Sequence, residues 1–366
     1  MVLKNYKELD GVRAIAALLV MVLHFFGDES MAGNKIIDVL KVLARFGQTG
    51  VTLFFVLSGF LITRILLATK NNHNYFKVFF IRRALRILPL YYLYLIIIFC
   101  IIPLFTNDFI PFKENWYYWI YLQNFAITFN WLQNGPAHYW SLAVEEHFYL
   151  FWPLLIYYLN VKQISRLIPV IIGLSLITRI ILLKNNYEVF YFTFTNMDAL
   201  AIGSLIAIME FRNKLNFRNP GFYFLMFLVF LIPSMVIGSF VSGQKLFIVQ
   251  LLKLPIIAVS YFFLILCVIT APANNFFKKI LSNRPFSFLG KISYGLYVFH
   301  PICFAMCIKY FYFNNIFLNI IIQFGVVLII ATISFYGYES FFLRFKNYFQ
   351  YSDKRSEIKN SKSYSI

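Results

Sequence analysis

The chain has 366 residues, of which 60% are hydrophobic and only 13% are charged, and its mean hydropathy is +0.71. Soluble domains carry about a quarter charged residues, so this composition excludes an ordinary soluble protein and indicates an integral membrane protein. The formal net charge of +18 would suit nucleic-acid binding. The basic residues lie between hydrophobic segments, however, so we expect a lipid bilayer and no nucleic acid as the partner of this charge.

Ten hydrophobic segments approach the length of a tilted membrane helix, which needs about 20 apolar residues. They are residues 11–27, 44–68, 86–104, 139–159, 165–184, 194–211, 221–240, 247–271, 292–311 and 316–343. The aromatic stretch 116–131 is too short and too polar to count as another, and we expect an interfacial or re-entrant piece. The sequence therefore predicts an all-α, polytopic integral membrane protein with about ten transmembrane helices.

The basic residues outside these segments predict the orientation of the chain. Most of them fall in alternate connections that include both chain ends. The positive-inside rule then places both termini in the cytoplasm. No internal repeat or long linker divides residues 1–343, which we expect to form one membrane domain. Residues 344–366 are expected to be a short, basic, disordered cytoplasmic tail.

Two general features limit the kind of protein further. The first segment contains Arg13 and His24 and has no small-residue cleavage site, so we do not expect a removable signal peptide. The four cysteines all lie in hydrophobic segments and predict neither a disulfide framework nor a metal site.

Arg13 and His24 are the first candidate functional residues. They are eleven positions apart, and at about 100° per residue they share one face of a helix, separated by about 16 Å along its axis. Such side chains are costly in a membrane unless they face a protein interior or a cavity. A neutral imidazole can accept a proton from a hydroxyl. A histidine hydrogen-bonded between helices is the alternative, and Arg13 on the same face favours the functional interpretation.

The second and third segments contain two further candidates. Ser58 and Gly59 are interpreted as a small-residue helix contact, because no nucleophile-elbow motif surrounds the serine. Arg82, Arg83 and Arg86 lie just before the third segment, and Arg82 and Arg86 share a helix face. Anchoring at the cytoplasmic surface and binding of phosphate groups explain these arginines equally well.

The fourth segment contains three adjacent ionisable residues, Glu145, Glu146 and His147. Adjacent residues on a helix point in different directions, and Tyr149 shares the face of Glu145. Two stray carboxylates in hydrocarbon would cost several kcal/mol, so a functional or ion-paired interior is favoured.

Two later segments contain polar residues whose roles are less specific. Asn196 and Asp198 lie at the outer end of the sixth segment, where a capping or packing role and a substrate role are equally open. His300 precedes Pro301 in the ninth segment. A proline frees a backbone carbonyl, and the residues alone favour His300 as the group that satisfies it.

Six motifs that contain these residues occur together in one order. They are LDGVRAIAALLVMVLHF, GVTLFFVLSGFLIT, RRALRILP, WSLAVEEHFYLFWP, MDALAIG and ISYGLYVFHP. With these motifs, which span roughly residues 9–302, the chain resembles the membrane-bound acyltransferase family 3, whose members modify bacterial surface glycans. The resemblance implies about ten helices in a bacterial cell (inner) membrane. It also implies transfer of an acyl group, often acetyl from cytoplasmic acetyl-CoA, to a carbohydrate hydroxyl outside.

The resemblance also implies roles for particular residues. His24 matches the essential histidine of the family, Arg13 its partner, and Glu145 the acidic position of the Trp-Ser-Leu motif, so these three are expected to be catalytic. The residues expected to bind acyl-CoA or the acceptor are Arg82, Arg83, Arg86, Tyr149, Asp198 and His300. Acyl-CoA is the expected donor substrate, and no bound cofactor or metal is expected.

The chain departs from the family pattern at three positions. Thr52 stands where an acidic residue is common, His147 where a glutamine is common, and Asn196 where an arginine is common. These departures bear on the donor and acceptor preferences. Some relatives carry an extra C-terminal hydrolase-like domain. We expect this chain to lack it, and so to finish the transfer itself or to pass the acyl group to a separate extracytoplasmic acyltransferase.

Several mechanistic and functional alternatives remain open from the sequence. His24 could act as a general base on the sugar hydroxyl or carry the acyl group transiently. Glu145 could orient His24 or pair with an arginine. A transporter or flippase of a lipid-linked sugar would use the same buried charges, with repeated halves and broken helices as its signature. A polysaccharide polymerase would be expected to have a large external loop.

Overall fold

The computed structural model describes residues 4–28, 35–131, 134–239 and 246–352. All regular structure in these ranges is helical. Each of the ten predicted segments coincides with a helix. These helices are α1 (Glu8–Asp28), α3 (Thr49–Thr69), α4 (Tyr75–Ile96), α8 (Trp140–Tyr158), α9 (Val161–Lys184), α10 (Thr193–Phe211), α11 (Pro220–Ser239), α12 (Phe247–Thr270), α15 (Ser293–Tyr310) and α16 (Ile316–Ser334).

Shorter helices connect these ten. They are α2 (Lys35–Arg45), α5 (Ile102–Thr106), α6 (Trp116–Trp119), α7 (Gln123–Thr128), α13 (Phe276–Leu281), α14 (Arg284–Lys291) and α17 (Ser340–Arg344). α6 and α7 lie in the aromatic stretch 116–131. Neither is long enough to cross a membrane, in agreement with the prediction that this stretch is no additional span.

The prediction of a polytopic membrane protein is confirmed. Seven helical stretches of the described residues are long and apolar enough to cross a membrane, and α14 with α15, bent by 70°, would make an eighth. α11 is a shorter apolar helix. α8 contains Glu145, Glu146 and His147, which reduce its hydropathy. That α8 and α11 also cross, to give ten spans, stays a prediction.

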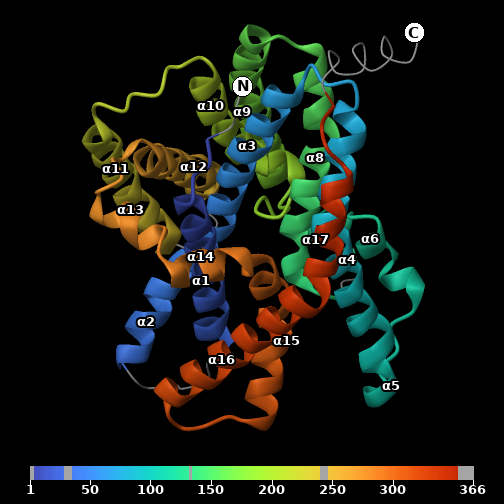
Figure 1. The fold of residues 1–366 in the computed structure, drawn as a ribbon. Helices are drawn as coiled ribbons and strands as arrows, with labels where there is room; N and C mark the ends of the chain where they lie inside the picture. Colours follow the sequence, from blue (N-terminus) through green and yellow to red (C-terminus); the bar gives the residue numbers. More distant parts are fainter. Residues whose placement is uncertain (1–3, 29–34, 132–133, 240–245, 353–366) are drawn as a thin grey trace, which may run out of the picture.

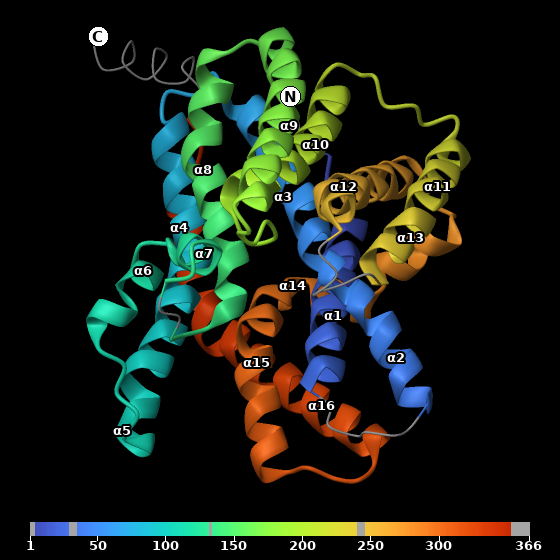
Figure 2. The same cartoon turned by 180° about the vertical axis from the view of Figure 1, so that it is seen from behind.

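α1 and α3 lie in the middle of the molecule, between α4 and α8 on one side and α11, α12 and α13 on the other (Figure 1 and Figure 2). α3 packs along α10 and also contacts α1, α8 and α12. α14 crosses α1, and α15 contacts both α1 and α4. Helices from both ends of the chain therefore surround α1, the helix that contains Arg13 and His24.

Glycines allow a close crossing of α3 with α10. A Cβ atom at Gly59 would lie 2.0 Å from the carbonyl oxygen of Leu200, and one at Gly203 would lie 2.0 Å from that of Val56. The backbones touch only because both side chains are absent. The predicted small-residue contact is thus confirmed at Gly59, and it leaves the neighbouring Ser58 on another face of α3.

Two further glycine contacts bring α13 and α14 onto α1. A Cβ atom at Gly290 would lie 2.0 Å from the carbonyl oxygen of Asp10, and one at Gly11 would lie 2.2 Å from that of Leu281. These contacts bring the start of α15 next to the first turns of α1, where Arg13 lies.

The two ends of the described chain lie at one end of the helix bundle. Arg64 donates to the carbonyl of Lys4 at 2.6 Å. Lys70 donates to the carbonyl of Leu159 at 2.6 Å, and Asn72 donates to that of Ser352 at 3.1 Å. This geometry agrees with the prediction that both termini lie on the same side of the membrane. That this side is the cytoplasm stays a prediction.

The first part of the predicted tail is ordered. Residues 345–348 form a short 3-10 helix that contacts α4, and the hydrogen bond from Asn72 fastens the chain at Ser352. The expectation of disorder is therefore wrong for these residues. The remainder of the predicted tail, 353–366, lies outside the described residues.

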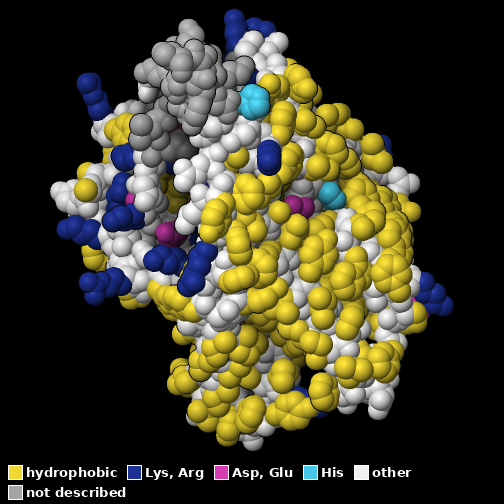
Figure 3. All heavy atoms as spheres, turned by 45° about the vertical axis from the view of Figure 1, so that its right-hand side comes forward, with side chains coloured by type: hydrophobic (Ala, Val, Ile, Leu, Met, Phe, Trp, Pro, Cys, Tyr) yellow, Lys and Arg dark blue, Asp and Glu magenta, His cyan; other side chains and the backbone are white. Residues whose placement is uncertain are grey.

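The surface agrees with a membrane environment. Hydrophobic side chains cover most of the face in Figure 3, whereas Lys and Arg gather toward its left and upper margins. A soluble protein rarely exposes apolar patches of this extent.

Candidate functional site

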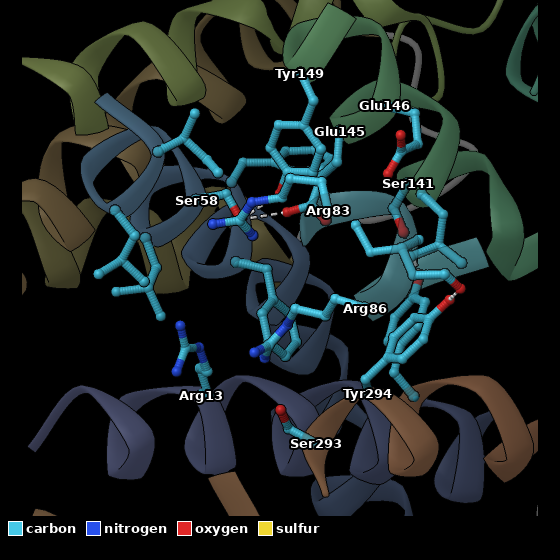
Figure 4. Close-up of a pocket in the computed structure, with 18 of the residues that line it drawn as sticks. Arg13, Ser58, Arg83, Arg86, Ser141, Glu145, Glu146, Tyr149, Ser293 and Tyr294 are labelled. Carbon is cyan, nitrogen blue, oxygen red and sulfur yellow. Dashed lines mark hydrogen bonds between the residues drawn. The ribbon is translucent and has the colours of Figure 1, made fainter. Parts of the chain in front are cut away.

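A cavity of about 900 Å³, including the space at its open mouth, lies between α1, α3, α4, α8 and the start of α15. Its walls are mainly apolar. The polar residues that line it are Arg13, Ser58, Arg83, Arg86, Ser141, Glu145, Glu146, Tyr149, Ser293, Tyr294 and Tyr297. The labelled ones come from all five helices (Figure 4).

α4 supplies two arginines to the cavity. α4 begins at Tyr75, so these arginines lie inside this helix. That they lie just before the membrane span stays a prediction. Arg83 and Arg86 line the cavity. Arg82 does not; it donates to the carbonyl of Phe349 at 3.3 Å and holds the C-terminal segment. Arg82 therefore has a partner in the C-terminal segment, whereas Arg83 and Arg86 face the cavity; the ligand role of these arginines stays a prediction.

Arg13 adds a third guanidinium from α1. Its Nη1 donates to Asp10 Oδ1 at 2.7 Å, one turn earlier on the same helix. The two side chains are 25% and 33% exposed, so the pair is open to the cavity rather than closed off. Arg13, Arg83 and Arg86 all reach into this cavity (Figure 4). Guanidinium groups arranged in this way suit phosphate or carboxylate groups, which they bind through paired N–H donors.

A hydrogen-bonded chain lies beside Arg83 (Figure 4). Tyr149 donates to Ser58 Oγ at 3.2 Å, and Ser58 donates to Glu145 Oε1 at 2.5 Å. The guanidinium carbon of Arg83 lies 5.5 Å from the centre of the Tyr149 ring, in the range of a cation–π contact. Sequence reasoning missed Ser58, since only the fold shows that it faces the carboxylate of another helix.

The three ionisable residues of α8 point in different directions, as predicted. Glu145 bonds to Ser58. Glu146 lines the cavity, and its Oε1 is buried without a hydrogen-bond partner among the described residues. His147 Nδ1 lies 2.8 Å from Thr193 Oγ1, on α10, outside the cavity.

His24 belongs to a cluster of three histidines. Its ring centre lies 4.9 Å from that of His300, and the ring of His300 lies 5.4 Å from that of His138. Glu145 therefore does not orient His24 in this structure; His300 contacts it instead. His138 was missed from the sequence, although it comes two residues before the Trp-Ser-Leu motif.

Tyr297 separates this histidine cluster from the cavity. It lines the cavity, and its ring centre lies 5.8 Å from that of His300. Its hydroxyl lies 2.7 Å from the carbonyl of His138 and 2.5 Å from Ser141 Oγ. His24 itself does not line the cavity. The arginines and the histidines are thus neighbouring parts of one region that meet at Tyr297.

Asp198 lies elsewhere. It forms an ion pair of 2.6 Å with Arg179 of α9, and neither side chain has any exposed surface. Asn196 donates to the carbonyl of Phe190 at 2.8 Å. The structure does not bring Asp198 to the cavity, and of the two interpretations left open for this segment, its contacts are those of packing.

The chain is similar to known acyltransferases. The family profile described as an acyltransferase domain matches residues 6–339. The peptidoglycan O-acetyltransferase OatA of Listeria monocytogenes is 28% identical over an alignment of 324 positions, which covers 81% of this chain and 49% of the relative. The putative peptidoglycan O-acetyltransferase YrhL of Bacillus subtilis is 28% identical over an alignment of 366 positions, which covers 90% of this chain and 54% of the relative.

A third relative, the O-acetyltransferase OatA of Staphylococcus aureus, is 27% identical over an alignment of 331 positions, which covers 80% of this chain and 49% of the relative. The chain thus spans about half the length of the curated relatives it matches. No solved structure matches it. Since the family profile covers nearly all of the described helices, from the first turn of α1 to the end of α16, this multi-pass membrane protein belongs to the acyltransferase 3 family.

Proposed function

We propose that this protein moves an acyl group from cytoplasmic acyl-CoA to a hydroxyl of a cell-surface or lipid-linked carbohydrate. Acetyl is the acyl group that we expect. The relatives are named O-acetyltransferases, two of them peptidoglycan O-acetyltransferases, one of these putative. The observation that carries the proposal is the cavity, in which Arg13, Arg83 and Arg86 gather beside the wall that separates it from His24.

The arginines are suited to hold the donor. Acyl-CoA carries several phosphate groups, and these would bind Arg83 and Arg86, which share the cavity with Arg13 and its partner Asp10. Arg83 and Arg86 form no ion pair within the described ranges. With the phosphates at these arginines, the flexible pantetheine arm of the donor would extend past Tyr297 toward His24.

His24 would supply the chemistry. As the hydroxyl oxygen of the sugar attacks the thioester carbonyl carbon, the imidazole takes the hydroxyl proton. The carbon–sulfur bond then breaks, and the proton passes to the departing CoA thiolate. A route in which His24 first carries the acyl group splits the same exchange into two steps. Both routes require the imidazole to be neutral and one ring nitrogen to be free.

Radiolabelled acetyl-CoA supplied to membranes that contain the protein tests this proposal. Wild type should label a carbohydrate product, and His24→Ala should reduce the labelling to the background of membranes without the protein. His73→Ala is the matched control, because His73 is an exposed histidine in the loop between α3 and α4. Equal labelling by wild type and His24→Ala would show that His24 is not the acid–base group.

A transporter of a lipid-linked sugar is the alternative from another class, because buried charges also mark transport pathways. The same membranes distinguish the two. If the sugar lipid crosses while acetyl-CoA is not consumed, the protein is a transporter. Adding the soluble fraction of the same cells then reports whether a second protein is needed to complete the transfer.

A further inference from the structure

The contact between His24 and His300 joins two helices that are far apart in sequence. His300 Nε2 lies 3.3 Å from His24 Nδ1, and the ring planes are inclined by 56°. His300 has no exposed surface. Two neutral imidazoles can form this hydrogen bond only if one of the two nitrogens carries the hydrogen and the other has the lone pair.

The backbone of α15 determines which nitrogen of His300 carries hydrogen. His300 Nδ1 lies 2.8 Å from the carbonyl oxygen of Tyr297 and 3.2 Å from that of Leu296. Carbonyl oxygens only accept, so Nδ1 carries the hydrogen and Nε2 has the lone pair; this assignment follows from the hydrogen bonds.

Pro301 is the reason that His300 is held in this state. In a regular helix the N–H of residue 301 would donate to the carbonyl of Tyr297, but proline has no N–H. The His300 ring supplies the missing donor. A buried carbonyl without a donor is costly, and so the backbone itself disfavours the other tautomer.

The surroundings of His24 lead to a complementary state. Its Nδ1 lies 2.9 Å from the carbonyl oxygen of Val20, so this nitrogen also carries hydrogen. The Nε2 lone pair of His300 is then a second acceptor for the same N–H. His24 Nε2 is left with the lone pair, and it has no hydrogen-bond partner among the described residues.

We propose that His300 is a positioning residue for His24 rather than a substrate-binding residue. It accepts from His24 Nδ1, holds the imidazole in the tautomer whose Nε2 can take a proton, and stabilises the imidazolium that then forms. The orienting partner in acid–base sites of this type is often a carboxylate. Here it is a neutral imidazole, and Pro301 sets its acceptor state. The inference rests on the proposed function, because it requires His24 to be the base.

His138 supports the second ring from its other side. Its Nε2 lies 3.2 Å from the carbonyl oxygen of Val298, also on α15, and so carries hydrogen. Its ring contacts that of His300 at 5.4 Å. His138 therefore limits rotation of the His300 ring without competing for the nitrogen that faces His24.

Two substitutions of His300 separate its two hydrogen bonds. The amide of asparagine reaches the place of Nδ1, so His300→Asn can still donate to Tyr297 but cannot reach His24. The longer glutamine places an oxygen near the position of Nε2, so His300→Gln can accept from His24. We expect His300→Asn to lower kcat by about 10²-fold, within the range that a positioned general base contributes. We expect His300→Gln to stay within about tenfold of wild type.

The split between kinetic constants distinguishes positioning from a donor-binding role. Both variants should keep the wild-type KM for acetyl-CoA, and both should elute as wild type in size-exclusion chromatography in detergent. If His300→Asn retains the kcat of wild type while His24→Ala is inactive, the positioning role is wrong and the proposed function stands. Equal loss of kcat in both variants would also exclude the acceptor role.

Pro301→Ala tests the same inference without changing either ring. The alanine restores a backbone N–H to the carbonyl of Tyr297, which removes the reason for His300 Nδ1 to carry hydrogen. We expect a lower kcat with unchanged or higher thermal stability. Pro255→Ala, in the interior of α12, is the matched control. An unchanged kcat in Pro301→Ala would contradict the assigned role of the proline.

Discussion

Charged residues occur inside the helix bundle in two arrangements. In one, arginines and carboxylates form ion pairs; in the other, the arginines do not. Beside α10, Arg179 pairs with Asp198 at 2.6 Å, and Arg64 pairs with Glu210 at 2.5 Å. In the cavity, Arg83 and Arg86 form no ion pair in the part of the chain that the structure describes.

The difference shows which intramembrane charges are structural. A buried pair that is complete needs no ligand, and it holds two helices in one register. Arg83 and Arg86 share the cavity with Glu145 and Glu146 but form no ion pair with them, and guanidinium groups in this state are suited to bind an anion. Residue type alone does not separate the two arrangements, because both contain arginines and carboxylates inside hydrophobic segments.

The largest effect is expected where a closed pair is broken. Asp198→Asn would leave the guanidinium of Arg179 buried without its counter-charge, which costs about 3–5 kcal/mol of folding stability. Thermal unfolding in detergent measures this loss. The double variant Arg179→Met with Asp198→Leu should recover most of it, since both charges are then absent. A single variant as stable as wild type would contradict the structural role of the pair.

Substitution of the cavity arginines should weaken the binding of acetyl-CoA and leave the folding stability unchanged. Arg83→Ala and Arg86→Ala should each raise the KM for acetyl-CoA by about 10- to 100-fold, which corresponds to the loss of about 1.5–3 kcal/mol for a charged hydrogen bond. Initial rates at varied acetyl-CoA concentration give this number. If KM stays the same and unfolding shifts instead, these arginines belong with the structural pairs.

A smaller loss of activity is expected in the hydrogen-bonded chain of Tyr149, Ser58 and Glu145. Ser58→Ala removes the donor to Glu145 and should lower kcat/KM by about tenfold, or about 1.4 kcal/mol. Ser260→Ala is the control, because Ser260 Oγ is buried without a hydrogen-bond partner among the described residues. Equal kinetics for the two variants would exclude a role of Ser58 in the cavity.

The smallest effect is expected at the arginine outside the cavity. Arg82→Ala removes the hydrogen bond to the carbonyl of Phe349, which contributes about 1 kcal/mol at most. KM for acetyl-CoA should change by less than about twofold, because this side chain does not line the cavity. Limited trypsin digestion should cut more readily at Arg344 and Lys346. A KM change as large as that of Arg83→Ala would place Arg82 at the ligand.

Part of the candidate site follows from sequence motifs. Of the predicted site residues, Arg13, Arg83, Arg86, Glu145 and Tyr149 line one cavity. His24 and His300 contact each other beside it. Arg82 and Asp198 have other partners. Arg82 is next to Arg83 on α4, and since adjacent residues point about 100° apart around a helix, the rotation of α4 decides which of them faces the cavity. The cavity-lining residues do not include any from α10, the helix of Asp198.

The sequence by itself determined the all-helical membrane architecture, because every backbone group in a bilayer must be satisfied within its own segment and apolar length is a local property. Only the tertiary structure decided which polar groups meet. Ser58 and Glu145 are 87 residues apart, and His24 and His300 are 276 apart. Such contacts depend on how the helices cross. Those crossings are set by close approaches such as that of α3 and α10, where the absence of a side chain at Gly59 and at Gly203 allows the backbones to touch.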